Sequence, residues 1–200
     1  MKQVFEKYRV WVLCEDRRQY DFIRGFLMSQ GVSGNRKFEL YADLPEGLGS
    51  GEQHVRKYFY DALRSHARSK ENKFLVIALD VDTKESKDIL QLLENIVHEN
   101  GGEEIKDSDK LFLVMPKRNI ETWFEWFETK MTRNDSVNET ADYKHKHRNA
   151  KPKTFGENFS RLYMEYLSKS DKATCELALP SLQLACNDFA KLCELLEKEG

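Results

Sequence analysis

The apolar run from Phe74 to Leu79 constrains the fold of this 200-residue chain more than any other stretch. Six consecutive apolar side chains, most of them branched, are typical of a strand that is buried on both faces. Strands of this kind occur in parallel sheets that are covered by helices. The run leads into Asp80 and Asp82, and strand alternation would point these two carboxylates to the same side.

Segments with strand patterns alternate with segments of helical spacing along the first two thirds of the chain. Strands are expected at 8–14, 36–42, 73–79 and 110–116. Helices are expected at 16–31, 52–69, 86–101 and 119–131, and a further helical segment at 155–197. The alternation predicts an α/β fold, with a Rossmann-like parallel sheet of about four strands flanked by helices and a helical C-terminal segment.

The composition fits a chain that buries one sizeable core, with 40% hydrophobic and 33% charged residues. Residues 1–133 are expected to form a catalytic core, 134–153 a basic polar insertion, and 154–200 a helical extension packed on the core. No metal-ligand or secreted-type spacing links the four cysteines, Cys14, Cys175, Cys186 and Cys193. No apolar run is long enough to span a membrane, so we expect a cytoplasmic protein.

Carboxylates follow three of the expected strands. Glu15 follows the first strand, Asp80 and Asp82 follow the third, and Glu121 lies in the first turn of the helix after the fourth. Because the carboxyl ends of parallel strands share one edge of a sheet, these side chains are expected to converge. Such a group is typical of Mg²⁺ or Mn²⁺ sites that activate water or hold a phosphate. The alternative for Glu15 and Asp16 is that they cap the following helix.

Two motifs resemble the signature of the TOPRIM domain, a glutamate after the first strand and an Asp-x-Asp after a later one. They are VLCED, which contains Glu15, and ALDVD, which contains Asp80 and Asp82. The segments MPKRNIETWF and LPSLQLACNDFAKL are similar to further elements of small standalone TOPRIM proteins from prokaryotic defence islands. The chain departs from the usual pattern at Asp16, where glycine is common, and at Gln19, where a second acid is common.

The resemblance to TOPRIM nucleases of the overcoming-lysogenization-defect (OLD) family implies a metal-dependent nuclease that takes part in phage defence. It implies that Asp80 and Asp82 bind Mg²⁺ or Mn²⁺ and that Glu15 lies at the metal and transfers a proton. Either Asp16 supplies to the metal the acid that is missing at Gln19, or the second metal site is weak. It also implies a partner ATPase. The glycine-rich residues 47–53, GLGSGEQ, lack the Gly-Lys-Ser/Thr end of a P-loop, so no ATP site is expected in this chain.

Basic residues could supply the nucleic-acid contacts that such a nuclease needs. The net charge of −2 gives no overall attraction to nucleic acid, so a basic surface must be local. Lys117 follows the fourth strand and could neutralise charge on a phosphate. The candidates for backbone binding, with DNA favoured over RNA, are Arg17, Arg18, Lys144, Lys146, Arg148, Lys151 and Lys153. The alternative for each is solvated surface charge.

Two other functions stay open at this point. The chain could be a non-catalytic TOPRIM-like subunit that binds nucleic acid or a partner protein, and the departure at Asp16 keeps this alternative open. A haloacid-dehalogenase-type phosphatase also carries Asp-x-Asp after a strand. That family expects a threonine two residues beyond the second aspartate, whereas Thr83 follows Asp82 directly. Whether the chain forms a homo-oligomer is also open.

Overall fold

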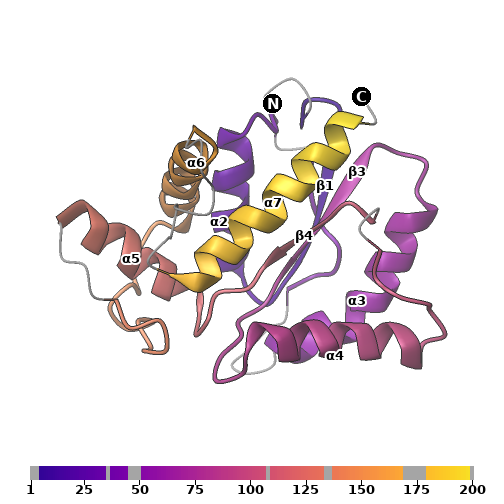
Figure 1. The fold of residues 1–200 in the computed structure, drawn as a ribbon, viewed down its shortest axis with the longest axis horizontal. Helices are drawn as coiled ribbons and strands as arrows, with labels where there is room; N and C mark the ends of the chain where they lie inside the picture. Colours follow the sequence, from indigo (N-terminus) through magenta and orange to yellow (C-terminus); the bar gives the residue numbers. More distant parts are fainter. Residues whose placement is uncertain are drawn as a thin grey trace.

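The computed structural model describes residues 5–34, 37–44, 51–106, 109–132, 137–168 and 179–198. In these residues, one parallel sheet has the strand order β2-β1-β3-β4 (Figure 1). Its strands are β1 (Arg9–Cys14), β2 (Phe38–Leu40), β3 (Lys73–Ala78) and β4 (Leu111–Val114). The predicted α/β class, with a parallel sheet of four strands, is confirmed.

Helices follow each strand, as the sequence predicts. They are α2 (Arg17–Ser29), α3 (Gly51–Arg68), α4 (Ser86–Glu99), α5 (Ile120–Thr132), α6 (Pro152–Ser168) and α7 (Pro180–Lys198). The last two confirm the helical C-terminal segment. Both begin at proline, which suits a first helical position because its fixed φ is helical and its missing N–H would have no partner there. No helix in the described ranges is long and apolar enough to cross a bilayer.

The side chains of β3 alternate between two apolar layers, and all six are buried. Phe74 and Val76 pack into the layer that contains residues of α2, α6 and α7. Leu75 and Ile77 pack into the other layer, which contains residues of α3 and α4. Figure 1 shows these two groups of helices on opposite sides of the sheet. The strand is therefore buried on both faces, as its unbroken apolar sequence predicts.

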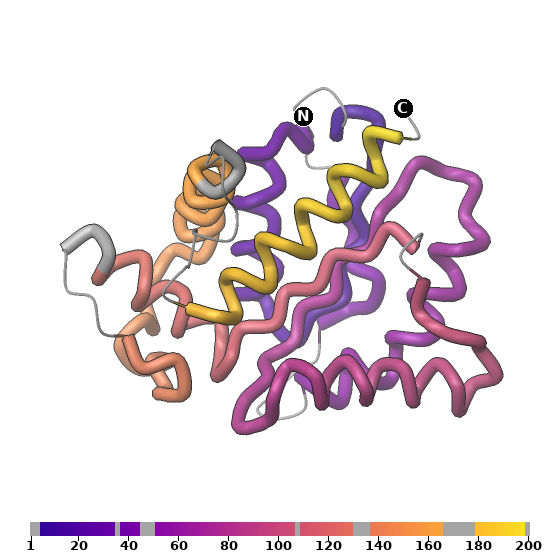
Figure 2. Tube along the Cα trace, viewed as in Figure 1, coloured from indigo at the N-terminus to yellow at the C-terminus, as the bar shows by residue number. Residues whose placement is uncertain are grey.

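The C-terminal helices are part of the same core as the sheet. In Figure 2 the trace of α7, in yellow, runs beside that of β4, and Asp188 of α7 accepts a hydrogen bond from the backbone N–H of Leu113 (2.7 Å). Helix α6 packs on α2 so closely that a Cβ atom on Gly25 would overlap the carbonyl oxygen of Lys153, and one on Gly156 that of Phe22. Residues 154–200 thus contribute described helices that close one side of the sheet.

The cysteines in the described residues are free thiols. Cys14, Cys186 and Cys193 are buried, and none of them is paired, in agreement with their spacing in the sequence. Cys175 lies outside the described residues.

The strand register places the candidate site. Cys14, the last residue of β1, pairs with Ala78, the last residue of β3, and Ala78 pairs with Val114, the last residue of β4. The residues that follow these three strand ends therefore emerge at one edge of the sheet. Glu15 follows Cys14 directly, and Asp80 lies two residues after Ala78.

Candidate active site

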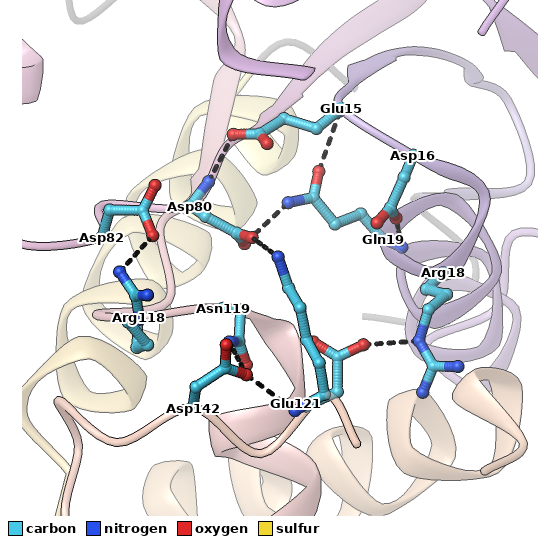
Figure 3. A network of polar contacts seen from close by, with 11 residues as sticks. Glu15, Asp16, Arg18, Gln19, Asp80, Asp82, Arg118, Asn119, Glu121 and Asp142 are labelled. Atoms are coloured by element: carbon cyan, nitrogen blue, oxygen red, sulfur yellow. Dashed lines mark hydrogen bonds and ion pairs between the residues drawn. The ribbon is translucent and has the colours of Figure 1, made fainter. Parts of the chain in front are cut away.

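Glu15 and Asp80 meet at the carboxyl edge of the sheet. Glu15 Oε1 accepts a hydrogen bond from the backbone N–H of Asp80 (2.7 Å). Gln19, a buried residue of α2, connects the same two residues, because its Oε1 accepts from the N–H of Glu15 and its Nε2 donates to Asp80 Oδ1, both at 2.9 Å (Figure 3). In the sequence, Gln19 stands out only as a departure from the TOPRIM pattern. Its hydrogen bonds to the residues after two strands depend on the fold, so sequence reasoning missed this role.

The two carboxyl groups hold their protons unusually well. Burial raises the pKa of Glu15 to about 7, and the charges of Asp16 and Asp82 add to this effect. Burial also raises the pKa of Asp80 well above its ordinary value, and the charge of Glu15 raises it further. Asp80 is only 8% exposed. A divalent cation between these groups would offset both causes, since a nearby positive charge favours the ionised form.

Asp16 and Asp82 have other partners. The Asp16 carboxylate caps α2 by accepting a hydrogen bond from the backbone N–H of Gln19 (2.9 Å), which is the capping alternative considered from the sequence. Asp82 Oδ1 pairs with Arg118 (2.7 Å), and its side chain is 53% exposed. Asp82 has a φ of +54°, beyond the end of β3 at Ala78. Strand alternation therefore no longer applies, and Figure 3 shows the Asp80 and Asp82 carboxylates pointing to different partners.

Glu121 and Asn119 add buried oxygen atoms without hydrogen-bond partners. Glu121 is 3% exposed, and its Oε1 forms an ion pair with Arg18 Nε (2.5 Å). Its Oε2 and the Oδ1 atom of Asn119 are buried and accept no hydrogen bond in the structure. Burial raises the pKa of Glu121, although the Arg18 guanidinium opposes the shift. Buried oxygen atoms normally have a donor, an ordered water or a cation as a partner. Figure 3 shows both residues on the side of Asp80 that faces away from Glu15.

A segment of turns, residues 137–151, lies next to this pair, and we call it the basic segment. Its Lys144 Nζ lies 3.9 Å from Asp80 Oδ2. Arg18 donates hydrogen bonds to the backbone carbonyl oxygens of His147 (2.6 Å) and Arg148 (3.2 Å). Asp142 Oδ1 accepts hydrogen bonds from Asn119 Nδ2 (3.1 Å) and from the backbone N–H of Lys144 (2.9 Å). The segment, which belongs to the basic polar insertion expected from the sequence, is thus held against α2 and the start of α5.

His147 is a buried residue of the basic segment. It is 3% exposed, and its Nε2 lies 2.9 Å from Glu125 Oε2 on α5. Lys146 Nζ lies 2.5 Å from the other oxygen, Oε1. Among the described residues, Glu125, Glu128 and His147 are the one group of three potential metal ligands whose atoms all lie within 4.8 Å of one another. Both oxygens of Glu125 already have partners in Lys146 and His147. We therefore interpret this group as a contact that holds the basic segment on α5.

The other predicted residues lie around this arrangement. Lys117 Nζ donates to the carbonyl oxygen of Lys84 and pairs with Glu85, both at 2.7 Å, so it holds the turn after β3. Arg17 pairs with Asp21 within α2 (3.1 Å). The exposed basic residues are Arg17, Lys144, Lys146, Arg148, Lys151 and Lys153, whereas Arg18 is partly buried.

Gly51 explains part of the glycine-rich stretch. It is the first residue of α3, and a Cβ atom there would lie 2.6 Å from Glu15 Oε2. The absence of a side chain at Gly51 therefore makes room for the Glu15 carboxylate at the start of α3, where the helix dipole favours a negative charge. Gly47 and Gly49 lie outside the described residues.

No family model, no curated protein and no solved structure matches the chain. The TOPRIM resemblance stays a prediction that depends on the motifs.

Loss of the buried contact at His147 should free the basic segment. We expect His147→Ala to raise the rate of tryptic cleavage after Lys144, Lys146 or Arg148 by about tenfold or more. The reason is that lowering the free energy of local opening by about 1.4 kcal/mol raises the population of the open, cleavable segment about tenfold. The measurement is limited proteolysis followed by mass spectrometry. His145→Ala is the matched control, since His145 is exposed. Equal cleavage rates in the two variants would contradict the role assigned to His147.

The raised pKa values make the stability of the metal-free protein depend on pH. Between pH 4.5 and 7 the folded Glu15 keeps a proton that the unfolded chain has lost, so the free energy of unfolding falls as the pH rises. A shift from 4.5 to about 7 corresponds to roughly 3 kcal/mol. Urea unfolding at pH 5 and pH 8 in a chelator should show this decrease, and Glu15→Gln should reduce it. A decrease of the same size in Glu15→Gln would assign it to other groups.

Proposed function

We propose that the chain is a TOPRIM-type nuclease that uses Mg²⁺ or Mn²⁺ to hydrolyse phosphodiester bonds in nucleic acid. The observation that carries the proposal is the contact between Glu15 and Asp80. These two buried carboxyl groups come from two parallel strand ends, Gln19 connects them, and both have raised pKa values. Ligands bind at this edge of α/β sheets, and perturbed carboxyl pairs are common in active sites.

The donor set fits a hard divalent cation. Carboxylate and amide oxygens are its preferred ligands. Glu121 Oε2 and Asn119 Oδ1, which are buried without a partner, would accept hydrogen bonds from water molecules bound to the ion. Glu15 and Asp80 would hold the ion, and Asp82 lies close enough for its charge to act on Glu15. A bound divalent ion supplies polarisation of the scissile phosphate and a lower pKa for the attacking water.

The chain's own groups account for the remaining requirements of the reaction. Glu15, which the bound cation would keep ionised, can accept a proton from water. Lys144, beside Asp80 and 58% exposed, can neutralise charge on the phosphate that is cleaved. The exposed basic residues around it, Arg148, Lys151 and Lys153, can bind the nucleic-acid backbone, with DNA favoured over RNA. A partner ATPase and a role in phage defence rest on the TOPRIM resemblance alone.

A cleavage assay on several substrates tests the proposal. The purified chain would be incubated with supercoiled plasmid, linear duplex, single-stranded DNA and transfer RNA in Mg²⁺, Mn²⁺ or chelator. We expect metal-dependent cleavage of at least one substrate, and its loss in Asp80→Ala/Asp82→Ala. Cleavage that persists in the double variant would show that the activity comes from another site or from a contaminant.

One observation favours the alternative of a non-catalytic subunit. Asp16 and Asp82, two of the four expected metal ligands, are occupied by the N–H of Gln19 and by Arg118. In that case no substrate is cleaved in any metal, and Asp80→Ala leaves the binding of nucleic acid or of a partner unchanged.

A further inference from the structure

The carboxylates at the sheet edge have protein cations as partners. Lys144 Nζ lies 3.9 Å from Asp80, Arg118 lies 2.7 Å from Asp82, and Arg18 pairs with Glu121. These cations come from three different parts of the chain. Within the described residues, Glu15 and Asp16 are the carboxylates of this edge that form no ion pair, and Asp16 caps α2 instead.

We propose that this edge binds a single divalent cation, between Glu15 and Asp80, and that the Lys144 ammonium takes the position of a second ion. The inference rests on the proposed nuclease function and specifies its metal content. Two-ion sites place the ions about 3.5–4 Å apart and need carboxylates that bridge them. Here Lys144 covers the Oδ2 side of Asp80, and Arg118 occupies Asp82.

The balance of charge supports one ion. Glu15, Asp16, Asp80, Asp82 and Glu121 contribute five negative charges when ionised, and the three cations leave two net negative charges. One divalent ion neutralises this charge. A second ion would leave two net positive charges in a site where Asp80 and Glu121 are buried, and unbalanced charge is costly at such a depth.

The position of Lys144 is fixed by its backbone. Its N–H donates to Asp142 Oδ1, and Asn119 Nδ2 donates to the same oxygen. On the other side, Arg18 holds the carbonyl oxygens of His147 and Arg148. The segment is therefore anchored on both sides of Lys144, at Asp142 and at residues 147–148, and this holds the lysine next to Asp80. The buried and unpartnered Glu121 Oε2, whose residue senses the charge of Lys144, is a further acceptor for the water shell of the single ion.

Counting bound Mn²⁺ tests the inference independently of activity. Isothermal titration and the electron paramagnetic resonance signal of free Mn²⁺ would be measured on the full chain, together with the cleavage assay. We expect one Mn²⁺ per chain. In Lys144→Met we expect Mn²⁺ to bind about tenfold more tightly or a second ion to appear, because the competing ammonium is gone, while cleavage falls about a hundredfold. Lys87→Met, an exposed lysine of α4, is the matched control and should behave as the unmodified chain.

The outcomes separate this inference from the proposed function. Two Mn²⁺ ions per chain together with cleavage would overturn the inference and leave the nuclease proposal in place. One ion whose affinity is the same in Lys144→Met would overturn the role of Lys144. One ion with tighter binding in Lys144→Met but no cleavage of any substrate would support the single-ion site and count against the nuclease. No bound Mn²⁺ and no cleavage would remove both.

Discussion

Replacing Asp80 with asparagine should lower metal-dependent cleavage by about a thousandfold or more while the fold stays intact. Asparagine keeps an oxygen that can accept the hydrogen bond from Gln19 Nε2, so the contact between α2 and the end of β3 is retained. The change removes the negative charge that attracts the cation and Lys144. A thousandfold loss corresponds to about 4 kcal/mol of transition-state stabilisation, which is a reasonable magnitude for loss of a metal ligand.

Stability distinguishes this expectation from a general loss of structure. In the metal-free protein at pH 8, Asp80→Asn should unfold at an equal or higher urea concentration than the unmodified chain. The reason is that a neutral amide replaces a buried carboxyl group that is close to Glu15. A residue with only a structural role would lose stability on the same change. Asp61→Asn, on the exposed side of α3, is the matched control and should change neither property.

The neighbouring acids should give graded effects. Glu15→Gln keeps the hydrogen bond from the Asp80 N–H but removes a proton acceptor, and we expect a loss of about a hundredfold or more. Asp82→Asn should lose less, about tenfold, since Asp82 is half exposed and paired with Arg118. Full activity in Asp80→Asn, or a larger loss in Asp82→Asn than in Asp80→Asn, would mean that the reacting atoms lie elsewhere on this edge.

The fold was largely predictable because its elements carry strong local patterns. The unbroken apolar run of β3 indicated a strand buried on both faces, and the helices showed regular apolar spacing. A parallel topology then required Glu15 and Asp80 to share an edge, whichever helices cover the sheet. The edge strand β2 is shorter than predicted, at Phe38–Leu40, because an alternating pattern does not fix where pairing ends.

The details of the site were less predictable, because they depend on contacts between residues far apart in the sequence. Lys144 reaches Asp80 across more than sixty positions, and no local pattern in the basic segment indicates that pairing. The Asp82 side chain does not point the same way as that of Asp80, because the Asp82 backbone adopts a positive φ that the Asp-x-Asp motif does not predict. Lys117, which the sequence suggested for phosphate binding, donates hydrogen bonds to the Lys84 carbonyl oxygen and to Glu85, because the turn after β3 places these groups next to it.

Gly25→Ala should destabilise the protein by about 3–5 kcal/mol, although alanine is the better helix former by about 1 kcal/mol. A Cβ atom at Gly25 would overlap the backbone of Lys153 at the start of α6, and backbone cannot rotate away as a flexible side chain can. Urea unfolding measures the effect. Ser29→Ala, in the last turn of the same helix, is the control that reports helix propensity alone.

The same change should also affect the candidate site. Helix α6 begins at Pro152, directly after the basic segment, so a displaced α6 would shift the segment that carries Lys144. We therefore expect the remaining folded Gly25→Ala protein to bind Mn²⁺ more tightly, as Lys144→Met should, because the ammonium moves away from Asp80. A gain in stability would instead show that α2 and α6 are further apart than described. Lower stability with unchanged Mn²⁺ affinity would mean that the contacts of Arg18 and Asn119 alone hold Lys144 in place.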